Sequence, residues 1–216
     1  MTGRAQSGAE EVANAITHGL GLLASAIAVP VLLVRTIPYT DTALDVGMAV
    51  FGATLFLMYL TSTLYHAVPH PRAKHLLRTL DHSAIYCLIA GTYTPFLLGA
   101  LRGAWGWSLL VVIWVLAVLG VTAKWTVGFR FPRLSTAVYL AMGWLILVAT
   151  VPLVRHVSPS GLAWLVAGGL CYTCGVAFHA TDQRLRFGHA VWHLFVAGGS
   201  ACHYFAVLWH AAPRPA

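Results

Sequence analysis

Three histidines stand at the ends of apolar segments, and their spacing is that of a metal site. His66 closes one apolar segment, whereas His189 and His193 open the last one, four residues apart in GHAVWH. Residues four apart share one helix face, so two such imidazoles can bind one ion. Neutral imidazole is the commonest side-chain metal ligand. With His66 as the third ligand, a tetrahedral zinc would keep one open position, which is typical of catalytic sites.

Two further residues could do chemistry beside that ion. Asp81 begins another apolar segment in LDHSAIY, and Ser62 lies one helical turn before His66 on the same face. Asp81 could orient a water, accept its proton or hold a ligand histidine in one tautomer, and Ser62 could contact the same water or a ligand. We predict catalytic roles for both.

Each of these residues also has a structural interpretation. His66 could simply lie among lipid headgroups, and two histidines four apart in a helix also occur by chance. Asp81 could be a first-turn acid favoured by the helix dipole, or an ion-pair partner of Arg78. Ser62 could bond to the backbone of its own helix. The metal site is favoured because all of these residues are expected at the same depth in the membrane.

Three other histidines are left outside the predicted ligand set. His18, in NAITHGLG, could line the same pocket or pack at a close helix contact. His82 should face about 100° away from the aspartate before it. His203 follows His189 by 14 residues, which is about 21 Å along a helix axis, so it cannot share the ion. We expect His203 to be a polar packing residue, with a deeper cavity as the alternative.

Composition indicates a membrane protein. Only 9% of the residues are charged and 59% are hydrophobic, whereas an ordinary soluble domain has about 25% charged residues. The apolar runs are also too long and too many for one soluble domain. Ionisable groups inside a bilayer are costly, so histidine and aspartate within such runs are functional candidates.

We expect an all-α bundle of seven membrane-spanning helices. Each apolar segment has close to the roughly 20 residues that a bilayer-crossing helix needs. The predicted spans are 13–35, 43–66, 80–100, 105–124, 134–155, 161–180 and 189–210. The connections between them are short and hold most of the charged and turn-forming residues. We therefore expect a single membrane domain over residues 1–216, with a short cytoplasmic tail over 1–12.

The distribution of lysine and arginine predicts the orientation of the bundle. The side of the N-terminus holds nine of them: Arg4, Arg72, Lys74, Arg78, Lys124, Arg130, Arg133, Arg184 and Arg186. The opposite side holds four: Arg35, Arg102, Arg155 and Arg214. We therefore expect a cytoplasmic N-terminus and an external C-terminus. The lysines and arginines that set the topology and contact anionic lipid headgroups explain the net charge of +7, so no nucleic-acid partner is expected.

This orientation brings distant residues to one membrane level. The second crossing would end, and the third and seventh crossings would begin, on the cytoplasmic side. His66, Asp81, His189 and His193 would then lie together, although more than 100 residues separate the first from the last two.

The segments NAITHGLG, STLYH, LDHSAIYCLIAGTYTPF and GHAVWHLFVAGGSACHYF, in this order, resemble the hemolysin III family of bacterial membrane proteins. That family is related to the progestin and adiponectin receptors and, more remotely, to alkaline ceramidases within the wider CREST group of membrane hydrolases. The resemblance covers essentially the whole chain. It implies a seven-helix bundle with its N-terminus inside, in the inner membrane of a bacterial cell.

The resemblance also implies a zinc site. In adiponectin receptors, zinc is held by one histidine that ends helix 2 and two that open helix 7, with a helix 3 aspartate nearby. The matching positions here are His66, His189, His193 and Asp81, and Ser62 matches the serine before the first histidine. Hormone reception is not implied, because the large N-terminal domain of those receptors has no counterpart here.

Two classes of function follow from these residues. The first is a zinc-dependent, ceramidase-like hydrolase of a lipid amide or ester at the membrane surface. The alternative is a hemolysin-type pore, or a non-enzymatic membrane protein in which zinc ties helices together. A pore would need charged residues along several helices, and the apolar segments here are nearly uncharged. The sequence leaves the substrate and the oligomeric state open.

Overall fold

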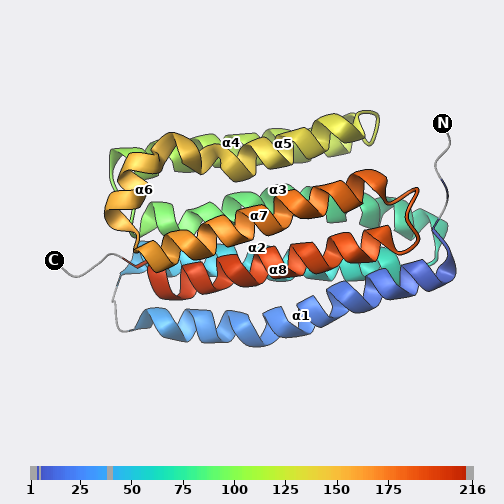
Figure 1. Ribbon diagram of the computed structural model, residues 1–216, viewed down its shortest axis with the longest axis horizontal. Coiled ribbons are helices and arrows are strands. Elements are labelled where there is room, and N and C mark those ends of the chain that lie inside the picture. The colour runs from blue at the N-terminus through green and yellow to red at the C-terminus, as the bar shows by residue number, and fades with distance from the viewer. Residues whose placement is uncertain (1–3, 5, 38–40, 213–216) are drawn as a thin grey trace.

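The computed structural model describes residues 4, 6–37 and 41–212, and the regular secondary structure of these residues is entirely helical (Figure 1). The predicted all-α class is thus confirmed for this part of the chain. The α-helices are α1 (Gly8–Thr36), α2 (Thr42–Ala67), α3 (Pro71–Leu98), α4 (Ala104–Thr126), α5 (Pro132–Trp144), α6 (Thr150–His156), α7 (Pro159–Thr181) and α8 (Gly188–His210). A 3₁₀-helix, η2 (Leu145–Ala149), joins α5 to α6.

Two of the predicted helix starts are wrong, and local capping explains both. Helix α1 begins at Gly8 rather than at 13, because Ser7 and Glu10 form a reciprocal capping box that starts the helix earlier. Helix α3 begins at Pro71 rather than at 80, since proline suits the first position of a helix. Asp81 therefore lies in the third turn of α3, and its interpretation as a first-turn acid is wrong.

The predicted span 134–155 is interrupted by η2, and Pro152 accounts for the break. In a regular α-helix, the proline ring would clash with the carbonyl of Val148, four residues earlier. At the interruption, the Tyr93 hydroxyl of α3 makes hydrogen bonds to backbone groups. It accepts the Ile146 N–H at 2.9 Å and donates toward the Met142 carbonyl at 2.8 Å. The four remaining predicted spans, 43–66, 105–124, 161–180 and 189–210, agree with α2, α4, α7 and α8 to within two residues at each end.

Within the described residues, six helices are long and apolar enough to cross a membrane, with Pro132–His156 counted as one. Helix α3 is not among them, although it has 28 residues. Arg72, His75 and Arg78 in its first turns are exposed. Further along, Thr79, Asp81, Ser83 and Thr94 are buried, because α3 packs against α2, α4, α5 and α8. The outward face of α1 is apolar and more than half exposed at Leu20, Leu23, Ile27 and Val31. Such a face suits contact with lipid.

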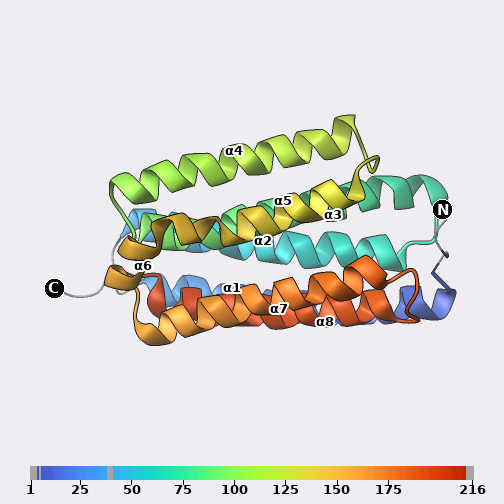
Figure 2. The same cartoon turned by 45° about the horizontal axis from the view of Figure 1, so that its top comes forward.

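The long helices run side by side along the long axis of the molecule (Figures 1 and 2). Helix α1 packs on α2 and α8, and α7 packs on α8 and α5. One end of the bundle gathers the start of α1, the end of α2, the start of α3, the end of α7 and the start of α8. Arg214 and residues 38–40 of the first predicted connection lie outside the described residues.

Gly47 of α2 lies against the backbone of Pro95 in α3. A methyl group at Gly47 would come within 2.8 Å of Pro95 Cα and 3.2 Å of its nitrogen. We therefore expect Gly47→Ala to lower the free energy of unfolding by about 1–3 kcal/mol through overpacking. Denaturant unfolding in detergent micelles would measure the change.

Gly143→Ala is the matched control for this substitution. A Cβ added at Gly143 meets no atom within 4 Å outside its own helix. Since alanine favours helix over glycine, this variant should match the wild type or gain up to about 1 kcal/mol. Equal stability of the two variants would contradict the close approach of α2 and α3.

Candidate metal centre

Three histidines from α2 and α8 converge at one end of the bundle. His66, His189 and His193 each offer one ligand atom, and these atoms lie within 4.8 Å of one another. The centroids of their rings are 4.7–5.2 Å apart. His66 and His193 are 5% and 2% exposed. The structure thus brings together residues that are far apart in the sequence, and the group could hold a metal ion.

Hydrogen bonds to carboxylates orient two of these rings. His66 Nδ1 lies 2.7 Å from Glu11 Oε2, and the other oxygen of Glu11 pairs with Lys74 Nζ at 2.8 Å. His189 Nδ1 lies 3.0 Å from Asp182 Oδ2. A carboxylate can only accept, so both Nδ1 atoms carry the hydrogen. Their Nε2 atoms then carry the lone pair that a metal needs, the arrangement typical of metal-binding histidines.

The third ring is held by α1. His193 Nδ1 lies 3.1 Å from Thr17 Oγ1 and 3.3 Å from the Asn14 carbonyl oxygen. The carbonyl can only accept, so His193 also donates through Nδ1. His66 Nε2 is buried without a hydrogen-bond partner. A buried polar atom without a partner costs free energy, so the site fits a group that accepts nitrogen lone pairs.

Ser62 and His18 form a second pair beside the three rings. Ser62 is 1% exposed and its Oγ lies 2.7 Å from His18 Nδ1. The His18 ring stacks on His193, with centroids 3.5 Å apart and an interplanar angle of 13°. The interpretation of His18 as a residue that lines the same pocket is therefore confirmed.

Asp81 faces the same pocket from α3. Its side chain is nearly buried and lies 3.5 Å from His82 Nδ1 through Oδ2. Among the described residues, neither Asp81 nor His82 belongs to a group of mutually close metal ligands. Asp81 thus lines the pocket beside the three histidines without belonging to their group.

The pocket is a cavity of about 230 Å³ that extends from the histidines deep into the bundle. Its histidine end includes His18, Ser62, Asp81, His189 and His193. Most of its remaining lining is apolar, contributed mainly by α3, α5, α7 and α8.

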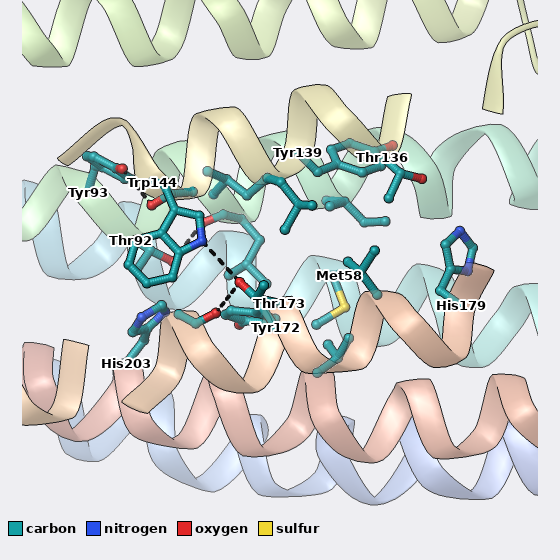
Figure 3. A pocket seen from close by; sticks show the side chains of 18 of the residues that line it. Met58, Thr92, Tyr93, Thr136, Tyr139, Trp144, Tyr172, Thr173, His179 and His203 are labelled. Atoms are coloured by element: carbon teal, nitrogen blue, oxygen red, sulfur yellow. Dashed lines mark hydrogen bonds between the residues drawn. The ribbon is translucent and has the colours of Figure 1, made fainter. Parts of the chain in front are cut away.

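The deep part of this cavity holds His203, Trp144 and Thr173 (Figure 3). The Trp144 indole N–H donates to the Thr173 hydroxyl at 3.0 Å. His203 Nε2 lies 3.2 Å from the Leu165 carbonyl, so it donates across the α7–α8 contact. Both interpretations of His203 hold, since it packs through a polar contact and lines the deeper cavity.

Sequence reasoning missed the hydrogen-bond partners of the three histidines. The partners Glu11 and Asn14 lie three residues apart and share one face of α1 with His18, which follows four residues later. Polar residues at that spacing in an otherwise apolar helix were the available signal. The signal for Asp182 was weaker, because this residue lies in a loop and has no helical spacing to mark it.

Glu10 is a further residue that the sequence did not single out. Its carboxylate accepts the backbone N–H of Phe187 at 3.0 Å and pairs with Arg4 at 2.7 Å. Phe187 precedes α8 and has a left-handed backbone with φ 59°. Glu10 thereby fixes the start of α8, and with it the position of His189.

Comparison with known proteins identifies the family. The family described as "Haemolysin-III related" matches residues 7–204. The chain belongs to the hemolysin III family. It is 47% identical to Hemolysin-3 of Bacillus cereus over 99% of this chain and 97% of that protein. It is 46% identical to the Hemolysin-3 homolog of Bacillus subtilis (strain 168), over 95% and 96% of the two chains.

A human protein is also similar to this chain, at lower identity. The chain is 32% identical to the Monocyte to macrophage differentiation factor of Homo sapiens, over 92% of this chain and 83% of that protein. The resemblance to a bacterial family with eukaryotic relatives is thus confirmed. The six apolar helices and the family membership make this hemolysin III chain a multi-pass integral membrane protein of the bacterial cell membrane.

Proposed function

We propose that this hemolysin III protein is a zinc-dependent hydrolase of a lipid amide or ester, with zinc bound by His66, His189 and His193. The observation that carries the proposal is the set of three converging imidazoles, each held through Nδ1 by an acceptor. Zinc favours nitrogen ligands in tetrahedral geometry, and three protein ligands leave it one open position. Iron or copper sites more often add carboxylate or sulfur ligands.

We also propose that all seven long helices cross the bilayer as one domain over residues 1–216, with α5, η2 and α6 forming one crossing. The burial of α3 from Thr79 onward supports this, because the polar residues of that part, such as Asp81 and Thr94, need not face lipid. The N-terminus is then cytoplasmic and the C-terminus external, as the excess of lysine and arginine at the histidine end favours. The three histidines would lie near the inner leaflet, level with lipid headgroups.

When bound, zinc would polarise a substrate carbonyl and lower the pKa of a water in its open position toward about 7. Asp81 acts as the general base and accepts the proton of the attacking water. If His18 donates through Nδ1 to Ser62 Oγ, the Ser62 hydroxyl hydrogen stays free. Ser62 then donates that hydrogen to the oxyanion that develops on the carbonyl.

The cavity suits a lipid chain. It continues from the catalytic end into the bundle and is lined largely by apolar side chains. An amide or ester at the headgroup level can therefore lie beside Asp81 and Ser62 while its acyl chain occupies the apolar part. Burial of that chain would supply binding free energy in proportion to the apolar area removed from water.

The experiment that tests this function measures fatty-acid release from ceramide-like amides and acyl esters by the purified protein in liposomes. We expect release that stops on metal chelation, returns with zinc and depends on Asp81. Absence of such turnover in folded, zinc-loaded protein would contradict the hydrolase. Liposome leakage that persists after alanine substitution of all three histidines would favour the pore-forming alternative.

Glu11→Gln should weaken zinc binding without removing a ligand. Glu11 accepts from His66 Nδ1 and pairs with Lys74, so the amide would lose the charge that holds the ring. We expect zinc affinity to fall about 10- to 100-fold, as for other residues that orient metal-binding histidines. Competition with a chelator of known affinity would measure the change.

Asp45→Asn is the control for Glu11→Gln, because it makes the same change of charge in the first turn of α2, at the opposite end of the bundle. This variant should bind zinc as the wild type does. Unchanged affinity in Glu11→Gln would contradict the role of Glu11 in orienting His66.

A further inference from the structure

A second group of ligand atoms lies beside the first and shares one member with it. His179 near the end of α7, Asp182 just after that helix, and His189 each offer one atom, and these atoms lie within 4.8 Å of one another. Asp182 Oδ2 is 3.0 Å from His189 Nδ1 and 3.8 Å from His179 Nδ1. His179 Nδ1 is buried and has no hydrogen-bond partner. Figure 3 shows His179 at one end of the cavity and His203 at the other. We call His179, Asp182 and His189 the outer set, and His66, His189 and His193 the inner set.

The two sets compete for one ring. A neutral imidazole has one N–H and one nitrogen lone pair. In the inner set, His189 would bind through Nε2 while its Nδ1–H donates to Asp182. In the outer set, the lone pair must be on Nδ1 instead, because that nitrogen faces Asp182. A neutral His189 can therefore serve only one set at a time.

The outer set is the more accessible and the more negative of the two. The side chains of His179, His189 and Asp182 are 30%, 17% and 16% exposed. The His66 side chain in the inner set is 2% exposed. The outer set includes a carboxylate, whereas the inner set has only imidazoles. The carboxylate beside the inner set, Glu11, is already paired with Lys74, so a cation that arrives from the histidine end should be attracted first to Asp182.

We propose that the outer set is a metal-loading site, which captures a divalent transition-metal ion and passes it to the inner set through His189. Such a transfer would require His189 to change tautomer: Nε2 would lose its proton and Nδ1 would regain one, so that the lone pair moves from Nδ1 to Nε2. No net proton is gained or lost. The Nδ1–H then donates to Asp182, as in the present structure. This inference rests on the inner site of the proposed function.

The rate of metal loading tests the proposal. Full-length protein stripped with a chelator would be mixed with zinc and a fluorescent zinc indicator in a stopped-flow instrument. We expect His179→Gln to slow zinc loading about tenfold. This is the lower end of the increase in association rate that a site gains by concentrating its ligand. Its final zinc content should equal that of the wild type. Loading at the wild-type rate, or a lower final content, would overturn the proposal.

His75→Gln is the matched control. His75 is an exposed histidine of α3 at the same end of the bundle and belongs to neither set. This variant should load zinc at the wild-type rate. An equal slowing in His75→Gln and His179→Gln would show a general effect of histidines at this end and would overturn the specific role of the outer set.

A second comparison separates the outer set from the proposed hydrolase. With His66→Ala and His193→Ala together, the outer set should still bind zinc weakly, and adding His179→Gln should abolish that binding. Equal binding by the double and triple variants would overturn the outer set. If His179→Gln loads zinc slowly but the zinc-loaded wild type cleaves no lipid, the hydrolase is refuted and the loading site stands.

Discussion

Protein that carries His189→Ala and His193→Ala together will contain less than about a tenth of the zinc of the wild type, because a single imidazole cannot hold the ion. Both histidines belong to the inner set, and His66 alone would remain of it. Elemental analysis of purified protein, expressed as zinc per chain, measures the loss. Lipid hydrolysis should disappear with the metal.

His203→Ala is the control for this pair. It removes one imidazole from the same helix, but His203 donates to the Leu165 carbonyl and lies in the deep part of the cavity. This variant should keep its zinc. Circular dichroism should show the same helical content in both proteins. A full complement of zinc in the double variant would exclude the inner set as the metal site.

Asp81→Asn will lower lipid hydrolysis about 100- to 10,000-fold, the contribution that a positioned general base typically makes. The amide keeps the shape of the side chain but cannot accept the proton. Asp81 is nearly buried, lines the cavity and stands apart from both ligand sets. Its zinc content should therefore stay at the wild-type level. Initial rates of fatty-acid release at saturating lipid would measure the effect.

Asp41→Asn provides a matched substitution at the other end of the bundle. Asp41 caps α2 by accepting the N–H groups of Ala43 and Leu44, and asparagine caps helices equally well. Hydrolysis by this variant should be unchanged. If Asp81→Asn lost its zinc along with its activity, Asp81 would be a metal-site residue rather than the base. Wild-type turnover in Asp81→Asn would refute the catalytic role altogether.

The sequence alone determined the features that depend on local pattern. The apolar runs predicted four helices, α2, α4, α7 and α8, to within two residues at each end, because length and composition decide what can cross a bilayer. The spacing of His189 and His193 put two rings on one helix face whatever the rest of the fold. The start of α3 was missed, since charged residues lengthen that helix beyond its apolar run.

Only the tertiary structure decided which faces of different helices meet. It brought Glu11 to His66 and Thr17 to His193, pairs that are separated by 55 and 176 residues. It also placed Asp182 beside His189 and so created the shared ligand of the two sets. The physical reason is that helical periodicity fixes directions within one helix, whereas the rotation of one helix against another depends on close packing such as that of Gly47 on Pro95.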